Sequence, residues 1–138
     1  MAKNVQIVFD CHDPDALATF WAAALGYERP PPPDGYDSWQ SWAREHGIPE
    51  NNASAVEDPV GVGPRLFFQR VPERKVAKNR VHLDINVAAP SAEDRRRLVD
   101  EEVDRLVGLG AVEVRPVEEH GEYCVNMLDP EGNEFDVQ

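Results

Sequence analysis

Apolar and polar positions recur along the first part of the chain in a pattern that predicts a strand followed by a helix. Residues 5–9 (VQIVF) form a short apolar run that is typical of a buried strand. Residues 13–25 carry apolar side chains at i, i+3, i+4, i+7 and i+8, which predicts an amphipathic helix. Asp13 is placed to cap this helix, Pro14 suits its first position, and Gly26 suits its end.

The next part of the chain is less regular. Four prolines at 30–33 interrupt any regular element. Residues 36–46 favour a short helix, because Trp39 and Trp42 lie at helical spacing and Gly47 follows as a stop. Two strands are predicted after it, at 53–57 and 65–71.

The strand–helix pattern then returns in the second half. Residues 80–87 alternate apolar and polar side chains, which predicts a strand. Ser91 begins a capping box, SAED, before a predicted helix that extends to about Val107. Three further strands are predicted at 112–117, 122–128 and 134–138.

The second half therefore repeats the first. Gln6 in VQIVFD has the position of His82 in VHLDIN, and the two helices end in similar LGY and LGA tripeptides. The repeat predicts an α+β fold made of two β-α-β-β-β modules, at about 1–76 and 80–138, within a single domain 1–138. Modules of roughly 65 residues bury too little surface alone, so we expect them to pack on each other or on another subunit.

Charge and composition narrow the class of protein. The net charge of −12 disfavours nucleic acid and anionic membranes as partners. Two cysteines make no disulfide framework, the first residues show no secretory leader, and no apolar run approaches the ~20 residues of a membrane span. We therefore expect a soluble cytoplasmic protein.

Three motifs resemble those of a known superfamily. They are Asp13 with FWAAALGY (residues 20–27), VHLDINV (residues 81–87) and DPEGNEFDV (residues 129–137). Together they resemble the vicinal-oxygen-chelate superfamily, which includes glyoxalase I, bleomycin resistance proteins and extradiol dioxygenases, and most closely its glyoxalase-like subgroup. The resemblance implies a curled mixed sheet around a cavity, with the helices outside, and a homodimer.

The resemblance also implies a set of candidate metal ligands. In metal-using members, four strand positions bind one divalent ion, such as Ni, Zn, Mn or Fe. Carried over to this chain, they fall on Gln6, Gln69, His82 and Asp136. Hard ions prefer carboxylate and imidazole to neutral amides, so this set is expected to bind weakly and no cofactor is expected. Asp84, on the same strand face as His82, is placed to supply a further oxygen.

Two classes of function remain open. In the first, a glyoxalase-like lyase or isomerase acts on a small molecule in the cavity between the modules, with His82 and Asp136 as acid or base. In the second, the protein binds or sequesters a small molecule without chemistry, as bleomycin resistance proteins do. The expected ligand contacts are Gln6, Gln69, Asp84, Trp39, Trp42, Phe67 and Cys124. A third alternative is an interaction module whose cavity is filled by its own side chains.

Overall fold

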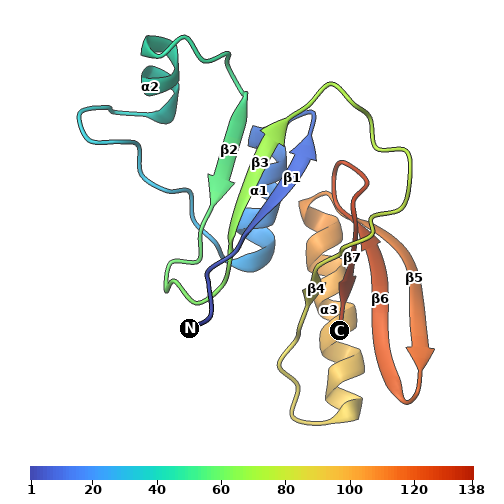
Figure 1. Ribbon diagram of the computed structural model, residues 1–138. Helices are drawn as coiled ribbons and strands as arrows, with labels where there is room; N and C mark the ends of the chain where they lie inside the picture. Colours follow the sequence, from blue (N-terminus) through green and yellow to red (C-terminus); the bar gives the residue numbers. More distant parts are fainter. The chain divides into compact units, whose positions relative to one another are not determined.

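Each of the two repeats folds as a unit of its own in the computed structural model, which describes all residues 1–138 (Figure 1). The first unit is Met1–Arg74 and the second is Lys75–Gln138. Three helices and two mixed sheets confirm the predicted α+β class. The enclosure of a cavity by both modules stays a prediction.

The first unit places one helix on a three-stranded sheet. Its elements are β1 (Gln6–Cys11), α1 (Pro14–Leu25), α2 (Trp39–Glu45), β2 (Ala53–Val56) and β3 (Arg65–Arg70). The strand order is β1-β3-β2, with β1 parallel and β2 antiparallel to β3. The core lies between α1 and the sheet, where the ring of Phe9 lies 5.5 Å from Trp21 and 5.3 Å from Phe68.

The ends of α1 follow the sequence signals closely. The Asp13 carboxylate accepts a hydrogen bond from the Ala16 N–H at 3.1 Å, and Pro14 is the first helical residue. Gly26 ends the helix with a φ of 68°, a conformation that favours glycine. These local predictions are confirmed.

The first unit lacks one of the strands that the repeat predicts. Only a single pair, Glu28 with Glu57, bridges at the free edge of β2. The prolines at 30–33 follow at once, and they lack the N–H groups that a longer strand would need. The chain instead makes α2, whose side chains are all at least partly exposed.

The second unit places one long helix on a four-stranded sheet. Its elements are β4 (Asp84–Ile85), α3 (Ala92–Leu109), β5 (Val112–Glu119), β6 (Glu122–Leu128) and β7 (Glu134–Val137). The strand order is β4-β7-β6-β5, so β4, β7 and β6 match β1, β3 and β2 of the first unit. Val99, Val103 and Leu106 of α3 are buried, as are the inward-facing residues of β6 and β7.

β4 is shorter than the predicted strand at 80–87. Its partner β7 has only four residues. The residues on either side of β4 are joined to the β7 segment only by single hydrogen bonds. The Leu83 carbonyl accepts from the Asp136 N–H at 3.0 Å, and the Val87 N–H donates to the Gln138 carbonyl at 2.7 Å. His82 therefore lies just before the paired stretch.

The turn before β7 is built by the first residue of DPEGN. The Asp129 side chain is 2% exposed and accepts hydrogen bonds from the N–H groups of Glu131 and Asn133 at 2.9 and 3.0 Å. Asp129 thus has a structural role, since it sets the point at which β7 begins.

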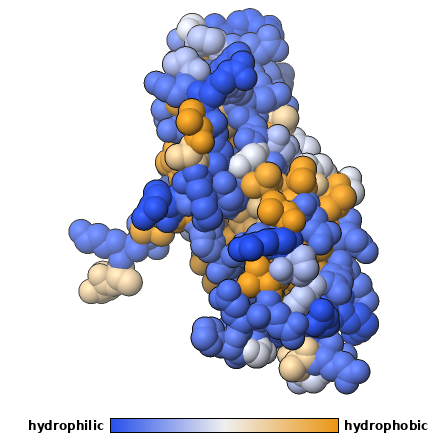
Figure 2. Space-filling model, turned by 90° about the vertical axis from the view of Figure 1, so that its right-hand side faces the viewer, coloured by the Kyte–Doolittle hydropathy of each residue, from blue (hydrophilic) through white to orange (hydrophobic).

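The surface is strongly polar. The face drawn in Figure 2 is mostly hydrophilic, in line with a mean hydropathy of −0.53. None of the three helices combines the length and the apolar character that crossing a membrane would require.

Candidate functional site

The face of the second sheet turned away from α3 carries a cluster of polar side chains. Phe135 and Val137 of β7 are buried, so the alternation of the strand turns Asp136 to the opposite face. The register places Asp84 of β4 on one side of Asp136 and Asn126 of β6 on the other. Three strands thus bring these polar groups together.

His82 joins this cluster from the segment that precedes β4. Its Nδ1 atom lies 2.8 Å from Oδ1 of Asp84 and 3.8 Å from Oδ2 of Asp136. Since an ionised carboxylate only accepts hydrogen bonds, Asp84 favours the tautomer with a proton on Nδ1. The side chains of His82 and Asp84 are 39% and 36% exposed, so the cluster is accessible in this structure.

A chain of hydrogen bonds orients Asp136. The Asn126 amide donates to Oδ1 of Asp136 at 2.7 Å, and Arg115 Nε donates to the Asn126 carbonyl oxygen at 3.3 Å. One carboxylate oxygen is therefore held, while the other faces His82. This role of Asn126 and Arg115 could not be predicted from the sequence, because it depends on the pairing of β5, β6 and β7.

Glu134 fixes the segment that leads to His82. Its carboxylate accepts a hydrogen bond from Lys75 Nζ at 3.1 Å and another from the Asn79 N–H at 2.9 Å. These contacts lower the pKa of Glu134 to about 2, with the Asn79 N–H as the largest cause. Glu134 therefore ties β7 to the segment that carries the imidazole.

Cys124 lies on the same face, two residues before Asn126 on β6. Burial, followed by the negative charges of Asp136 and Asp84, raises the pKa of its thiol. The thiol is therefore neutral near pH 7 and is poorly suited to nucleophilic attack.

The cluster meets one requirement of a divalent metal site, which is that several ligand atoms lie close together. One ligand atom each from His82, Asp84 and Asp136 lies within 4.8 Å of the other two. Ligands at ~2.1 Å from a common ion are about 3.0–3.4 Å apart in octahedral or tetrahedral geometry, so small side-chain adjustments would complete the site. Two carboxylates also balance the charge of a divalent ion, which the predicted set with a single carboxylate does not.

Gln6 and Gln69 lie on one face of the first sheet but are not neighbours. Gln6 is in register with Arg65, and Gln69 is in register with Asp10, four residues further along β1. This offset separates them by about 13 Å along the strands. The carbonyl oxygen of the Gln6 amide accepts a hydrogen bond from the Arg65 guanidinium, which also binds Glu57 at 2.8 Å.

The internal repeat shows which residues of the first unit correspond to the cluster. When the two repeats are aligned so that Gln6 corresponds to His82, Phe67 corresponds to Asp136. Gln69 corresponds instead to Gln138. The other two pairs are Val8 with Asp84 and Ala55 with Asn126. The first unit therefore has mainly apolar residues where the second has its polar cluster.

Trp39 and Trp42 lie on α2, which stands apart from the first sheet (Figure 1). Their rings meet edge to face at 5.6 Å, and Trp42 stacks on His46 at 4.6 Å. The Trp39 indole N–H donates to the Pro30 carbonyl at 2.8 Å, which ties α2 to the proline-rich segment. Their predicted contact with a ligand stays a prediction.

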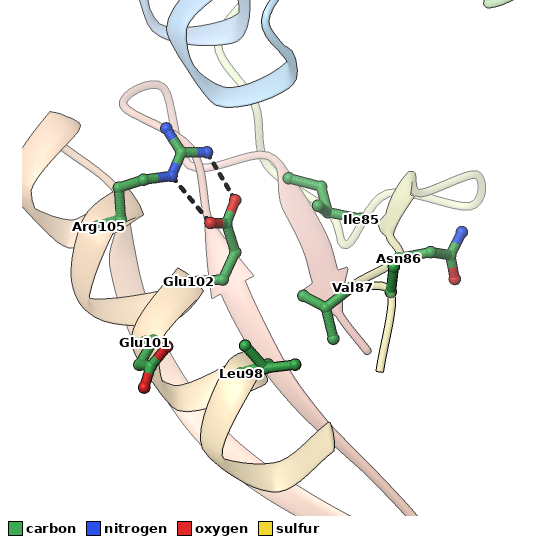
Figure 3. Close-up of a pocket in the computed structure, with 8 residues that line it drawn as sticks. Ile85, Asn86, Val87, Leu98, Glu101, Glu102 and Arg105 are labelled. Carbon is green, nitrogen blue, oxygen red and sulfur yellow. Dashed lines mark hydrogen bonds and ion pairs between the residues drawn. The ribbon is translucent and has the colours of Figure 1, made fainter. Parts of the chain in front are cut away.

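Two hollows lie in the second unit. The larger, of about 490 Å³, lies between β4 and α3, where Ile85, Val87 and Leu98 point inward while Asn86 points away (Figure 3). It is on the helix side of β4 and is distinct from the His82 cluster. The smaller, of about 280 Å³, lies near the β5–β6 hairpin and includes Cys124.

The sequence from residue 6 to residue 138 matches the profile of a family described as the glyoxalase-like domain. The chain belongs to this family. A comparison with curated proteins found no match. The glyoxalase-like assignment confirms the resemblance seen in the motifs at residues 20–27, 81–87 and 129–137.

Solved structures share the glyoxalase-like fold at low sequence identity. A glyoxalase/bleomycin resistance protein/dioxygenase family enzyme from Burkholderia phytofirmans PsJN has a TM-score of 0.66 and 16% identity, over 96% of this chain and 94% of that one. The fosfomycin resistance protein FosX from Listeria monocytogenes, in a mutant complexed with Mn(II) and 1S,2S-dihydroxypropylphosphonic acid, has a TM-score of 0.65 and 13% identity, over 100% and 90% of the chains. A glyoxalase-related enzyme from Fulvimarina pelagi has a TM-score of 0.63 and 16% identity, over 99% and 87%.

Proposed function

We propose that this glyoxalase-like protein is an enzyme that acts on a small, oxygen-rich molecule at the open face of the second sheet. The observation that carries the proposal is the convergence of His82, Asp84 and Asp136 on one point. An imidazole flanked by two carboxylates can take up and return a proton, the step that lyases and isomerases of this type need. The ligand is proposed to lie in a cavity that both modules line.

The residues of the cluster have separate tasks. Asp84 holds the Nδ1 proton of His82, which leaves Nε2 as the nitrogen that exchanges a proton with the ligand. Oδ2 of Asp136 lies 3.8 Å from the same Nδ1 atom, which places a second carboxylate beside the ring. Asn126 keeps the Asp136 carboxylate turned towards the ring.

A divalent ion fits the same cluster, held by His82, Asp84 and Asp136. When bound, such an ion would polarise neighbouring oxygen atoms of a substrate as a Lewis acid. Nδ1 of His82 can hold either a proton, which it donates to Asp84, or a metal ion, but not both. Without an ion, the cluster therefore acts as an acid–base group. The structure of FosX with Mn(II) supports considering an ion here, since it has the same fold.

The proposal is tested with a panel of small oxygenated compounds, such as 2-oxoaldehyde thiol adducts, epoxides and catechols. The compounds are incubated with metal-free and metal-loaded protein and followed by proton NMR. A compound that is converted by the wild type should remain unchanged with His82→Ala and should still be converted by Asn86→Ala, which alters the residue just after β4. Conversion that persists in His82→Ala would refute the proposed role.

A second function is favoured by the apolar residues of the first unit. Val8, Ala55 and Phe67 occupy positions that correspond to the polar cluster, and they suit a flat or apolar ligand. A protein that only sequesters such a compound would release it chemically unchanged, and His82→Ala would alter affinity alone. Equilibrium dialysis followed by mass spectrometry of the recovered compound separates the two functions.

Association and location stay predictions of the sequence. We propose a homodimer on the basis of the resemblance, and a cytoplasmic location on the basis of the cysteine content and the sequence signals. Light scattering of the purified protein measures the number of subunits.

A further inference from the structure

We infer that the open face of the first sheet binds a small planar carboxylic acid, whose carboxylate is held by Arg65 and whose flat part lies on Val8 and Phe67. This site lies in the first unit and contains none of the residues of the His82 cluster. The inference rests on the second function proposed above, the binding of a flat compound. It adds the negative charge of that compound and the residue that recognises it.

The first step concerns the face of the first sheet that turns away from α1. Phe9 and Phe68 lie on the α1 side, where Phe9 contacts Trp21 at 5.5 Å and Phe68 is fully buried. The alternation of the strands therefore turns Val8 and Phe67 to the opposite face, where the parallel register makes them neighbours. Val8 is 50% exposed and Phe67 is half-buried, so the two side chains form a small apolar platform that a ligand can reach.

The second step concerns Arg65, which lies two residues before Phe67 on the same face of β3. Its Nε donates a hydrogen bond to Oε1 of Glu57 at 2.8 Å, and its Nη1 donates to the carbonyl oxygen of Gln6. The guanidinium carbon also lies 5.5 Å from the centre of the Phe67 ring. These contacts fix the guanidinium before a ligand arrives, so binding does not have to order a flexible side chain.

The third step concerns the donors that remain on Arg65. A guanidinium has five N–H groups, and the bonds to Glu57 and Gln6 use two of them, which leaves three on Nη1 and Nη2. The Arg65 side chain is 36% exposed, so a ligand can reach these groups. Neighbouring Nη1 and Nη2 groups match the two oxygens of a carboxylate, and hydrogen bonds between charged partners are stronger than neutral ones.

The arrangement of charge and apolar surface indicates the class of ligand. Arg65 and Phe67 are two residues apart on β3, which is about 6–7 Å along the strand and close to the length of a benzoate ion. A planar acid of this size reaches the guanidinium with its carboxylate while its ring lies on the platform. The net charge of −12 disfavours large polyanions, so a small ligand with a single carboxylate fits best.

The test compares three small compounds on the full-length protein. They are benzoate, benzamide, which has the same ring without the charge, and cyclohexanecarboxylate, which has the charge without the flat ring. Saturation-transfer difference NMR at increasing ligand concentration gives the dissociation constants. The wild type should bind benzoate at least about tenfold more tightly than benzamide, because the carboxylate makes charge-assisted hydrogen bonds. It should also bind benzoate more tightly than cyclohexanecarboxylate.

Variants assign the two preferences to single residues. Arg65→Gln should remove the preference for benzoate over benzamide, and Phe67→Ala should remove the preference for benzoate over cyclohexanecarboxylate. Glu57→Gln keeps an acceptor for Arg65 Nε but removes the negative charge beside it, so benzoate should bind about two- to fivefold more tightly. A purely structural role of the Arg65–Glu57 pair would not produce this gain.

The controls separate the site from general charge and from the fold. Arg74→Gln makes the same charge change at an exposed residue that ends the first unit, and it should bind benzoate as the wild type does. Thermal unfolding of each variant checks that it is folded. If Arg65→Gln does not fold, Arg65→Lys replaces it. A single ammonium cannot make the two-pronged contact, so Arg65→Lys should weaken benzoate binding by at least about threefold.

Three results would overturn the inference. Equal affinities of the wild type for benzoate and benzamide would show that Arg65 does not select a carboxylate, yet the binding of flat neutral compounds would still stand as a function. A loss of benzoate binding in Arg74→Gln as large as in Arg65→Gln would assign the effect to net charge. If none of the three compounds binds even at high millimolar concentration, a second copy or another part of the protein covers this face. His82-dependent conversion of a compound could still be observed in each case.

Discussion

Replacing Glu134 by Gln should remove a charge-dependent part of the stability of the second unit. The Glu134 carboxylate accepts from Lys75 and from the Asn79 N–H, and Gln keeps its shape while losing its charge and one accepting oxygen. A carboxyl whose pKa falls from 4.5 to about 2 on folding contributes at most about 3 kcal/mol at neutral pH. The Glu134 and Lys75 side chains are 26% and 25% exposed, so screening by water reduces our expectation to about 1–2 kcal/mol.

The sign of the pH dependence follows from the lowered pKa. The stabilisation is complete above the unfolded value of 4.5 and is lost as the pH falls towards about 2. Between pH 7 and pH 3, roughly 60% of the contribution should therefore disappear. The difference in free energy of unfolding between wild type and Glu134→Gln should shrink accordingly.

Urea denaturation at a series of pH values, followed by circular dichroism, measures this difference. Glu50→Gln, at an exposed turn residue of the first unit, is the control for loss of one negative charge. A difference between wild type and Glu134→Gln that stays constant from pH 7 to pH 3 would contradict the argument, because it would show that the charge of Glu134 does not stabilise the fold.

Three further predictions concern the framework around the site. Asp129→Ala should lower the free energy of unfolding by about 2–4 kcal/mol in urea denaturation, since it leaves two part-buried N–H groups of the turn without their acceptor. Trp21→Ala should cost about 3–5 kcal/mol in the same assay, because Trp21 is 1% exposed in the core of the first unit. Tyr123 should ionise only near pH 12 in an ultraviolet absorbance titration, because its ring is partly buried and its hydroxyl donates to Asp100 at 2.6 Å. Asp100→Asn should lower that pKa, and an unchanged titration would show that Asp100 is not the cause.

Features that depend on neighbouring residues could be predicted from the sequence. The cap of α1 by Asp13 and its end at Gly26 involve residues a few positions apart, and both were predicted. The same holds for α3, which begins after Ser91 as expected and extends to Leu109, two residues beyond the predicted end. The motifs also identified the glyoxalase-like family.

The first unit departs from the pattern that the repeat predicts. Similar strand and helix signals predicted equal numbers of strands in both halves, but the prolines at 30–33 left a single bridge at Glu28. The resemblance places a candidate ligand on or near Gln69, while the β1–β3 register, with Gln6 aligned to His82, matches Phe67 with Asp136. The two positions are two residues apart and share a face of the strand, so alternation alone does not distinguish them.

The sequence by itself determined the family, the order of helices and strands, and the place of His82, Asp84 and Asp136 in predicted strands. Only the tertiary structure decided that these three side chains lie close together. It also decided that Asn126 orients Asp136 and that Arg65 donates a hydrogen bond to Gln6. The physical reason is the range of the interactions. Helix caps and turns arise between residues a few positions apart, whereas the cluster depends on the register between strands that lie about fifty residues apart in the chain.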